Sequence, residues 1–208
     1  MKRVRRFFLA VLGALLGATV AVLYYPGRHP STPKMTTIEF VNIGDVDRDL
    51  LPAMAPAVAQ AYAVSYRLAP SSMPLPEQGY NPQRRQYLAS SLREQLRALV
   101  VSPGQHLLGV TNADVYGEGL NFLFGESDLP GPVSVMSLAR LRPRHGNPEA
   151  IHALLLERAI KIAIHELGHS VGLEHCPNET CVMHFANSLG DLDRTTRQFD
   201  RRCRERLR

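Results

Sequence analysis

The chain has 208 residues, of which 45% are hydrophobic and 21% are charged, so it can bury the core of one globular domain. Its formal net charge of +5 comes from the first 34 residues, which hold six of the 24 basic residues and no acidic residue. The rest of the chain holds 18 basic against 19 acidic residues, and this balance argues against a nucleic-acid partner.

The N-terminal segment has the pattern of a membrane-targeting sequence. Four of the first six residues are Lys or Arg, and residues 7–25 then run for 19 positions without a charge. This length is close to the ~20 residues that a helix needs to span a bilayer. We predict that residues 1–34 form an uncleaved transmembrane anchor with a Pro-rich linker, which makes the membrane a partner and holds the body outside the cytoplasm. A cleaved signal peptide, and hence a secreted protein, is the alternative.

The body, residues 35–208, is predicted as one domain in which strands alternate with helices. In chain order we predict a strand at 37–42, a helix at 50–60, a strand at 62–68, a helix at 84–100, strands at 106–111, 120–124 and 132–138, and a long helix at 148–171. A turn at 128–131 separates the last two strands. The pattern predicts an α/β (α+β) fold, with a mixed sheet backed by helices.

The long predicted helix carries a metal-ligand pattern. His165 and His169 are four residues apart, so they lie on one helix face, where two imidazoles can share a metal. Glu166 follows the first histidine and can face a metal-bound water without being a ligand. Gly172 suits the left-handed residue that ends a helix and turns the chain, and this turn brings His175 back as a third ligand. Three protein ligands plus water are the open, catalytic form of a zinc site.

These residues also resemble a known family. The motif H-E-x-x-H-x-x-G-x-x-H, with Cys181-Val-Met183 downstream, resembles the metzincin metallopeptidases, and the cysteine directly after the third histidine resembles the archaemetzincins among them. The same resemblance extends to the segments RRQY at 84–87, LGVT at 108–111, NFLFG at 121–125 and SLARL at 137–141. It implies a metzincin-like twisted mixed sheet with an active-site helix, a Met-turn in which Met183 forms the apolar floor under the metal, and a C-terminal helix.

The resemblance implies a zinc metallopeptidase that acts on a peptide or protein substrate, with Glu166 as the general base for a zinc-activated water. The strand at 120–125 is then expected to form the sheet edge on which a peptide adds as a further strand. Phe185 stands where some metzincins carry a metal-binding tyrosine, and a phenyl ring cannot bind metal. The alternative is a catalytically weak or inactive zinc-binding module. Glu166 favours the enzyme, because binding alone needs no general base.

The cysteines suggest a second metal site. Archaemetzincins hold a four-coordinate structural zinc with H-C-x4-C-x-M and a distal C-x-x-C, whereas the distal pair here reads Asp200-Arg-Arg-Cys203. We therefore predict a structural zinc bound by Cys176, Cys181 and Cys203, with Asp200 in the place of the fourth ligand. A disulfide between Cys176 and Cys181, which leaves Cys203 unpaired, is the alternative.

Overall fold

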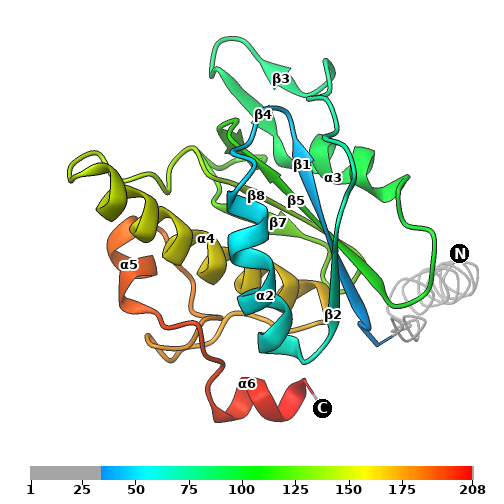
Figure 1. The fold of residues 1–208 in the computed structure, drawn as a ribbon, viewed down its shortest axis with the longest axis vertical. Coiled ribbons are helices and arrows are strands. Elements are labelled where there is room, and N and C mark those ends of the chain that lie inside the picture. The colour runs from blue at the N-terminus through cyan, green and yellow to red at the C-terminus, as the bar shows by residue number, and fades with distance from the viewer. Residues whose placement is uncertain (1–33, 208) are drawn as a thin grey trace, which may run out of the picture. The chain divides into compact units, whose positions relative to one another are not determined.

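The computed structural model describes residues 34–207, which form a mixed α/β domain (Figure 1). The elements in chain order are β1 (Thr37–Ile43), α2 (Leu50–Tyr62), β2 (Ser65–Leu68), β3 (Tyr80–Asn81), β4 (Gln86–Leu88), α3 (Ala89–Arg97), β5 (Gln105–Thr111), β6 (Val115–Tyr116), β7 (Gly125–Ser127), β8 (Val133–Ser137), α4 (Pro148–Ser170), α5 (Leu189–Arg194) and α6 (Arg201–Arg206). The predicted fold class, a mixed sheet backed by helices, is confirmed.

The main sheet has five strands in the order β2-β1-β5-β8-β7, and a smaller sheet has the order β3-β4-β6. The strands β2, β1, β5 and β8 run parallel to one another, whereas β7 runs antiparallel to β8. Because β7 pairs with β8 on one side only, it forms an edge of the sheet.

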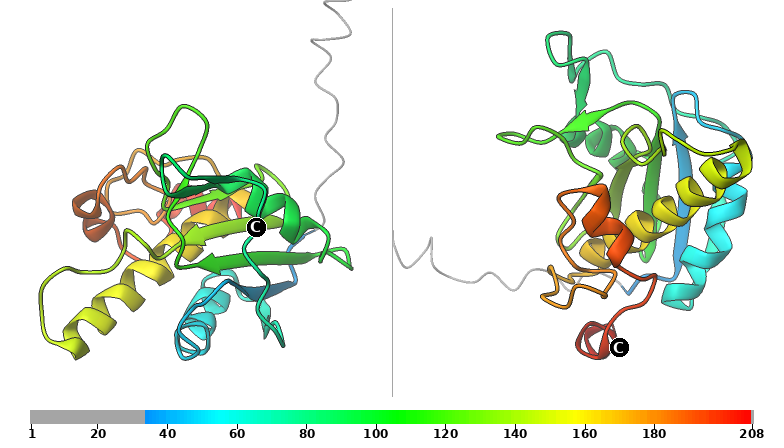
Figure 2. Two further views of the ribbon diagram at one scale, coloured as in Figure 1. Left: turned by 90° about the horizontal axis from the view of Figure 1, so that it is seen from above. Right: turned by 90° about the vertical axis from the view of Figure 1, so that its left-hand side faces the viewer.

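Helices cover both faces of the main sheet (Figure 2). Side chains alternate between the faces along a strand, and β1 shows this directly. Ile38 and Phe40 pack into the core that α2 and α4 share, while Val41 and Ile43 pack into the core beneath α3. The helix α4 therefore lies on the α2 side of the sheet, beside β8 and the edge strand β7, and this arrangement positions the functional site.

Two predicted elements are shifted in the structure. The predicted strand at 120–124 is a loop, and the edge strand begins at Gly125. The helix predicted from residue 84 begins only at Ala89, because Gln86–Leu88 pair as β4 with β3 and β6. In both places the pairing partner decides the conformation, and local spacing does not reveal that partner.

The prediction of a membrane anchor is corrected. Among residues 34–207, no helix combines the length and the apolar character that crossing a membrane requires. Residues 1–33, on which the prediction was based, lie outside the described part of the chain. An uncharged run of sufficient length permits a spanning helix but does not establish one. The transmembrane helix, the membrane as a partner and the location outside the cytoplasm, whether anchored or secreted, are therefore withdrawn.

Candidate active site

The helix α4 and the turn after it position the three histidines of the motif. Asn147 caps the start of α4, where its side chain accepts a hydrogen bond from the backbone N of Ala150 at 2.8 Å. At the other end Gly172 has φ of +90°, in the left-handed region that a residue with a Cβ rarely adopts. The chain reverses there as the sequence predicted, and His175 returns towards His165 and His169 on the helix.

The three imidazoles form a donor set that fits a zinc ion. One ring nitrogen from each of His165, His169 and His175 lies within 4.8 Å of the others. The Nδ1 atoms of His165 and His169 lie 2.8 Å and 2.7 Å from the carbonyl oxygens of Val182 and Leu173. A carbonyl oxygen only accepts hydrogen bonds, so each Nδ1 carries the proton and each Nε2 presents a lone pair.

The two Nε2 atoms face each other at 3.0 Å. Lone pairs at this distance repel unless a cation or a proton lies between them. Two nitrogens on a tetrahedral zinc are separated by roughly 3.3 Å, given Zn–N bonds of about 2.0–2.1 Å. The spacing and the tautomers therefore match the needs of a zinc ligand set.

Burial keeps these histidines neutral. Desolvation, together with a smaller effect of the nearby His169, lowers the pKa of His165 to about 3. Burial also lowers the pKa of His169 and of His175 below the ordinary histidine value. Zinc binds the neutral imidazole, so no proton has to be removed from these rings at neutral pH.

Met183 is fully buried directly beside the helix turn that carries the histidines. A Cβ added at Gly168 would lie 2.3 Å from the sulfur of Met183, so only glycine leaves room for this thioether. The backbone N of Cys176 also donates to the carbonyl oxygen of Met183 at 2.8 Å. The loop of the third histidine and the segment of Met183 are thus joined by both packing and a backbone hydrogen bond.

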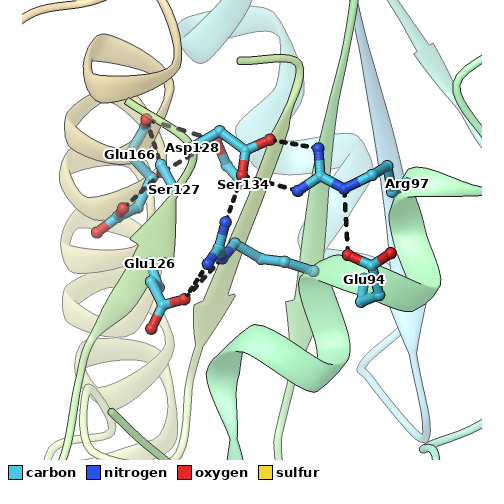
Figure 3. A network of polar contacts seen from close by, with 8 residues as sticks. Glu94, Arg97, Glu126, Ser127, Asp128, Ser134 and Glu166 are labelled. Atoms are coloured by element: carbon cyan, nitrogen blue, oxygen red, sulfur yellow. Dashed lines mark hydrogen bonds and ion pairs between the residues drawn. The ribbon is translucent and has the colours of Figure 1, made fainter. Parts of the chain in front are cut away.

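Glu166 lies in the same cleft but outside the ligand set. Its carboxylate is buried, and the Oε2 atom accepts a hydrogen bond from Ser127 Oγ at 2.7 Å (Figure 3). Burial raises the pKa of Glu166 to about 8, while the hydrogen bond from Ser127 acts to lower it. The sequence does not reveal this contact between Ser127 and Glu166, because the local pattern around a serine on an edge strand does not show which distant helix it meets.

A cleft of about 350 Å³ opens over these groups. The edge strand β7, the helix α4 and the segment after Met183 line it, and His184 belongs to the lining. Three exposed apolar side chains stand along it: Leu120, Leu129 and Phe185, with exposed fractions of 51%, 55% and 56%. The ring of Phe185 lies 5.0 Å from the ring of His175. Its apolar rim offers contact surface for the side chains of a peptide.

The cysteines form a second cluster. The sulfur atoms of Cys176, Cys181 and Cys203 and a carboxylate oxygen of Asp200 lie within 4.8 Å of one another. All three cysteines are free thiols, so the structure does not contain the disulfide considered as an alternative. Three sulfur donors and one carboxylate oxygen fit a closed zinc site.

Asp200 has two separate roles in this cluster. Its Oδ1 atom accepts a hydrogen bond from the backbone N of Cys203 at 2.8 Å and so caps α6, while its Oδ2 atom accepts from the thiol of Cys176 at 3.1 Å. These two hydrogen bonds lower the pKa of Asp200, the backbone bond contributing more. A charged oxygen therefore faces the three sulfurs.

Comparison with known proteins agrees with this geometry. Residues 67–208 match the model of peptidase family M54. The archaemetzincin of Pyrococcus abyssi is 39% identical over 185 residues, which cover 83% of this chain and 95% of the relative. The archaemetzincin of Methanopyrus kandleri is 46% identical over 135 residues, which cover 64% of this chain and 72% of the relative.

Solved structures show the same fold. The crystal structure of the Methanopyrus kandleri archaemetzincin has a TM-score of 0.71 at 36% identity, covering 84% of this chain and 94% of that one. That of the Archaeoglobus fulgidus archaemetzincin, complexed with malonate, has a TM-score of 0.70 at 33% identity, covering 82% and 99%. The family model, the relatives and the fold agree, and this chain therefore belongs to peptidase family M54, the archaemetzincins, and is a zinc metallopeptidase.

Proposed function

We propose that this chain hydrolyses a peptide bond by attack of a water molecule from which Glu166 removes a proton, at a zinc site formed by His165, His169 and His175. The observation that carries the proposal is the buried carboxylate beside three neutral, converging imidazoles. The alternative of a zinc-binding module without turnover is not favoured, because the chain belongs to a family of peptidases.

Each residue has a defined task in this reaction. When held by the three histidines, zinc would supply Lewis acidity that lowers the pKa of a water towards about 7 and polarises the scissile carbonyl. Glu166 accepts the proton of the attacking water and delivers it to the leaving amine. Burial alone would keep this carboxylate protonated, and the positive charge of a metal held nearby would favour its ionised form.

The substrate binds along β7. The outer edge of β7 is not paired within the described sheet, and Gly125, Glu126 and Ser127 all line the cleft. An extended peptide can add to this edge through backbone hydrogen bonds, which would place its scissile bond beside Glu166.

A second, structural zinc is held by Cys176, Cys181, Cys203 and Asp200. The support is the convergence of three thiols and one carboxylate oxygen. Since Cys176 directly follows His175 and Cys181 precedes Met183 by two residues, a closed site here would fix both loops of the active centre.

The test of the catalytic proposal is Glu166→Gln, compared with His169→Ala. Glu166→Gln removes the proton acceptor without removing a ligand, so we expect zinc content to stay at the wild-type level while hydrolysis of a peptide substrate is lost. His169→Ala should lose the catalytic zinc as well. Metal content measured by mass spectrometry separates the two, and a Glu166→Gln enzyme that retains turnover, or loses as much zinc as His169→Ala, would refute the assignment.

A further inference from the structure

The carboxylate of Glu166 is held by a specific partner on the edge strand (Figure 3). The hydroxyl of Ser127 lies 2.7 Å from Glu166 Oε2 and 2.8 Å from the backbone oxygen of Glu166. Ser134 Oγ on the neighbouring strand lies 3.0 Å from the same hydroxyl. A hydroxyl has one proton to donate, and the carboxylate is the strongest acceptor within reach, so the proton of Ser127 is directed at Oε2.

The same face of β7 also provides the space that Glu166 occupies. A Cβ at Gly125 would lie 2.6 Å from the Cγ, Cδ and Oε1 atoms of Glu166, closer than any real contact of that kind. Gly125 and Ser127 are two residues apart on a strand and therefore face the same side. Gly125 leaves a recess for the carboxylate, and Ser127, two residues later, binds one of the carboxylate oxygens.

The opposite face of the strand is anchored to α3. Arg93 pairs with Glu126 at 2.6 Å and also with Asp128, and Arg97 pairs with Asp128 at 2.9 Å. The side chains of Arg93 and Asp128 are only 19% and 12% exposed, so these ion pairs are partly shielded from water. The edge strand is thus fixed from the side away from Glu166, and the position of Ser127 is defined.

We propose that Ser127 is a positioning residue for Glu166, holding its carboxylate in one orientation in the recess left by Gly125. This inference rests on the proposed role of Glu166 as general base. Because Ser127 acts through Glu166 and is distinct from the zinc ligands, its removal should slow the chemical step and leave zinc binding intact.

The contact itself is tested without measuring activity, by double-mutant cycles on the metal-free protein. Ser127→Ala and Glu166→Ala should be non-additive, with the double variant melting about 2–4 °C higher than the sum of the two losses predicts. Gly125→Ala should lower the melting temperature in the wild-type background, and Glu166→Ala should relieve most of that loss. Strict additivity in both cycles would overturn the proposal.

Kinetics then test the functional role. Ser127→Ala should lower kcat about tenfold, the equivalent of one hydrogen bond to a charged group, with KM and zinc content unchanged. Ser127→Thr, which keeps the hydroxyl, should recover part of kcat. The control is Ser137→Ala, which removes a buried hydroxyl that donates to the backbone oxygen of Ala113 and accepts from the backbone N of Ala139.

These outcomes distinguish a failure of the role proposed for Ser127 from a failure of the role proposed for Glu166. If Glu166→Gln is inactive but Ser127→Ala keeps wild-type kcat, Ser127 does not position the base. If Ser127→Ala loses zinc, or changes KM alone, its role is also not the one proposed. If Glu166→Gln itself keeps turnover, the proposed function fails first, and the thermal cycles still report whether the contact exists.

Discussion

At the scale of single residues, Glu166 combines two conflicting requirements. It is buried, which raises its pKa to about 8, yet a general base must be ionised to accept a proton. The hydrogen bond from Ser127 and the charge of Arg93 both act to lower this pKa, and bound zinc acts in the same direction. The charge state of the base and the occupancy of the metal site are therefore linked.

This linkage predicts how the stability of the metal-free protein depends on pH. The pKa of Glu166 is raised from its ordinary value of 4.5 to about 8, so its contribution to stability is present below 4.5 and is lost as the pH rises to 8. Glu166→Gln should abolish this pH-dependent loss of stability, because glutamine does not ionise. Relative to wild type, the metal-free variant should gain a few °C in melting temperature between about pH 5 and about pH 8.

Thermal scans in the presence of a chelator measure this difference, and the exposed Glu118→Gln serves as the control. Added zinc should reduce the difference at the higher pH, because the metal stabilises the ionised carboxylate. A pH profile identical for wild type and Glu166→Gln would contradict the burial of a titrating carboxyl.

At the scale of elements, the loop before β7 depends on a contact that lies outside the cleft. Arg84 donates to the backbone oxygens of Leu120 and Asn121 at 2.8 Å and 3.0 Å, and its guanidinium lies 4.3 Å from the centre of the Tyr116 ring. The loop supplies Leu120 and the following phenylalanines to the cleft lining. The turn between β3 and β4 therefore supports the loop that lines the cleft from outside the cleft.

Arg84→Ala should consequently weaken substrate binding more than catalysis. Loss of charge-assisted hydrogen bonds to the loop should raise KM by roughly tenfold with a smaller effect on kcat, while zinc content is retained. Steady-state kinetics with a peptide substrate provide the measurement. Arg85→Ala, a substitution at the neighbouring exposed arginine, is the control. Equal effects of the two substitutions on KM would show that Arg84 does not act through its hydrogen bonds to this loop.

At the scale of the whole molecule, Asp200 joins the start of α6 to the loop of the third histidine. Asp200→Cys replaces a carboxylate by a thiolate, a better zinc ligand, but removes the cap of α6. The variant should bind zinc more tightly at the cysteine site, yet its metal-free form should melt at a lower temperature. Asp200→Asn should bind zinc less tightly at this site while its metal-free form keeps its melting temperature, because asparagine caps a helix well but has no charge to offer a metal.

Zinc stoichiometry, thiol titration and melting temperature together decide this prediction. Cys203→Ser should lower zinc content by one equivalent while the three-histidine site stays occupied. A stoichiometry of one zinc per chain in every variant, with all thiols titrating as free, would exclude the second site.

The sequence predicts those parts of the site that lie close together along the chain. His165, Glu166 and His169 share one helix, and Gly172 with its φ of +90° returns His175 to them, so spacing alone reveals the constellation. The cysteine cluster was predicted only through the family resemblance. The contacts of Ser127 with Glu166 and of Arg84 with Leu120 join residues 39 and 36 positions apart, and no local pattern encodes such pairs.

The strands of the main sheet also differ in how well their own sequence predicts them. Gln105–Thr111 and Val133–Ser137 are buried throughout, and Thr37–Ile43 mixes buried apolar with half-buried polar residues, so the sequence marks all three as strands. The edge strand β7 is short, half-buried and polar, and only its pairing with β8 defines it. Among the elements that line the cleft, the edge strand was therefore harder to place from the sequence than the helix α4.

The pleat of β7 has an electrostatic consequence. Glu126 and Asp128 are additional carboxylates close to a site that relies on a single proton acceptor and on a cation. Because they face α3, Arg93 and Arg97 neutralise them, and Arg93 opposes the effect of Glu126 on the pKa of Glu166. The helix on the far side of the sheet thus partly offsets the effect of Glu126 on the active carboxylate. Glu126, which also lines the cleft, and Asp128 are therefore held in ion pairs with arginines, which reduces the negative charge that they add beside the proposed metal site.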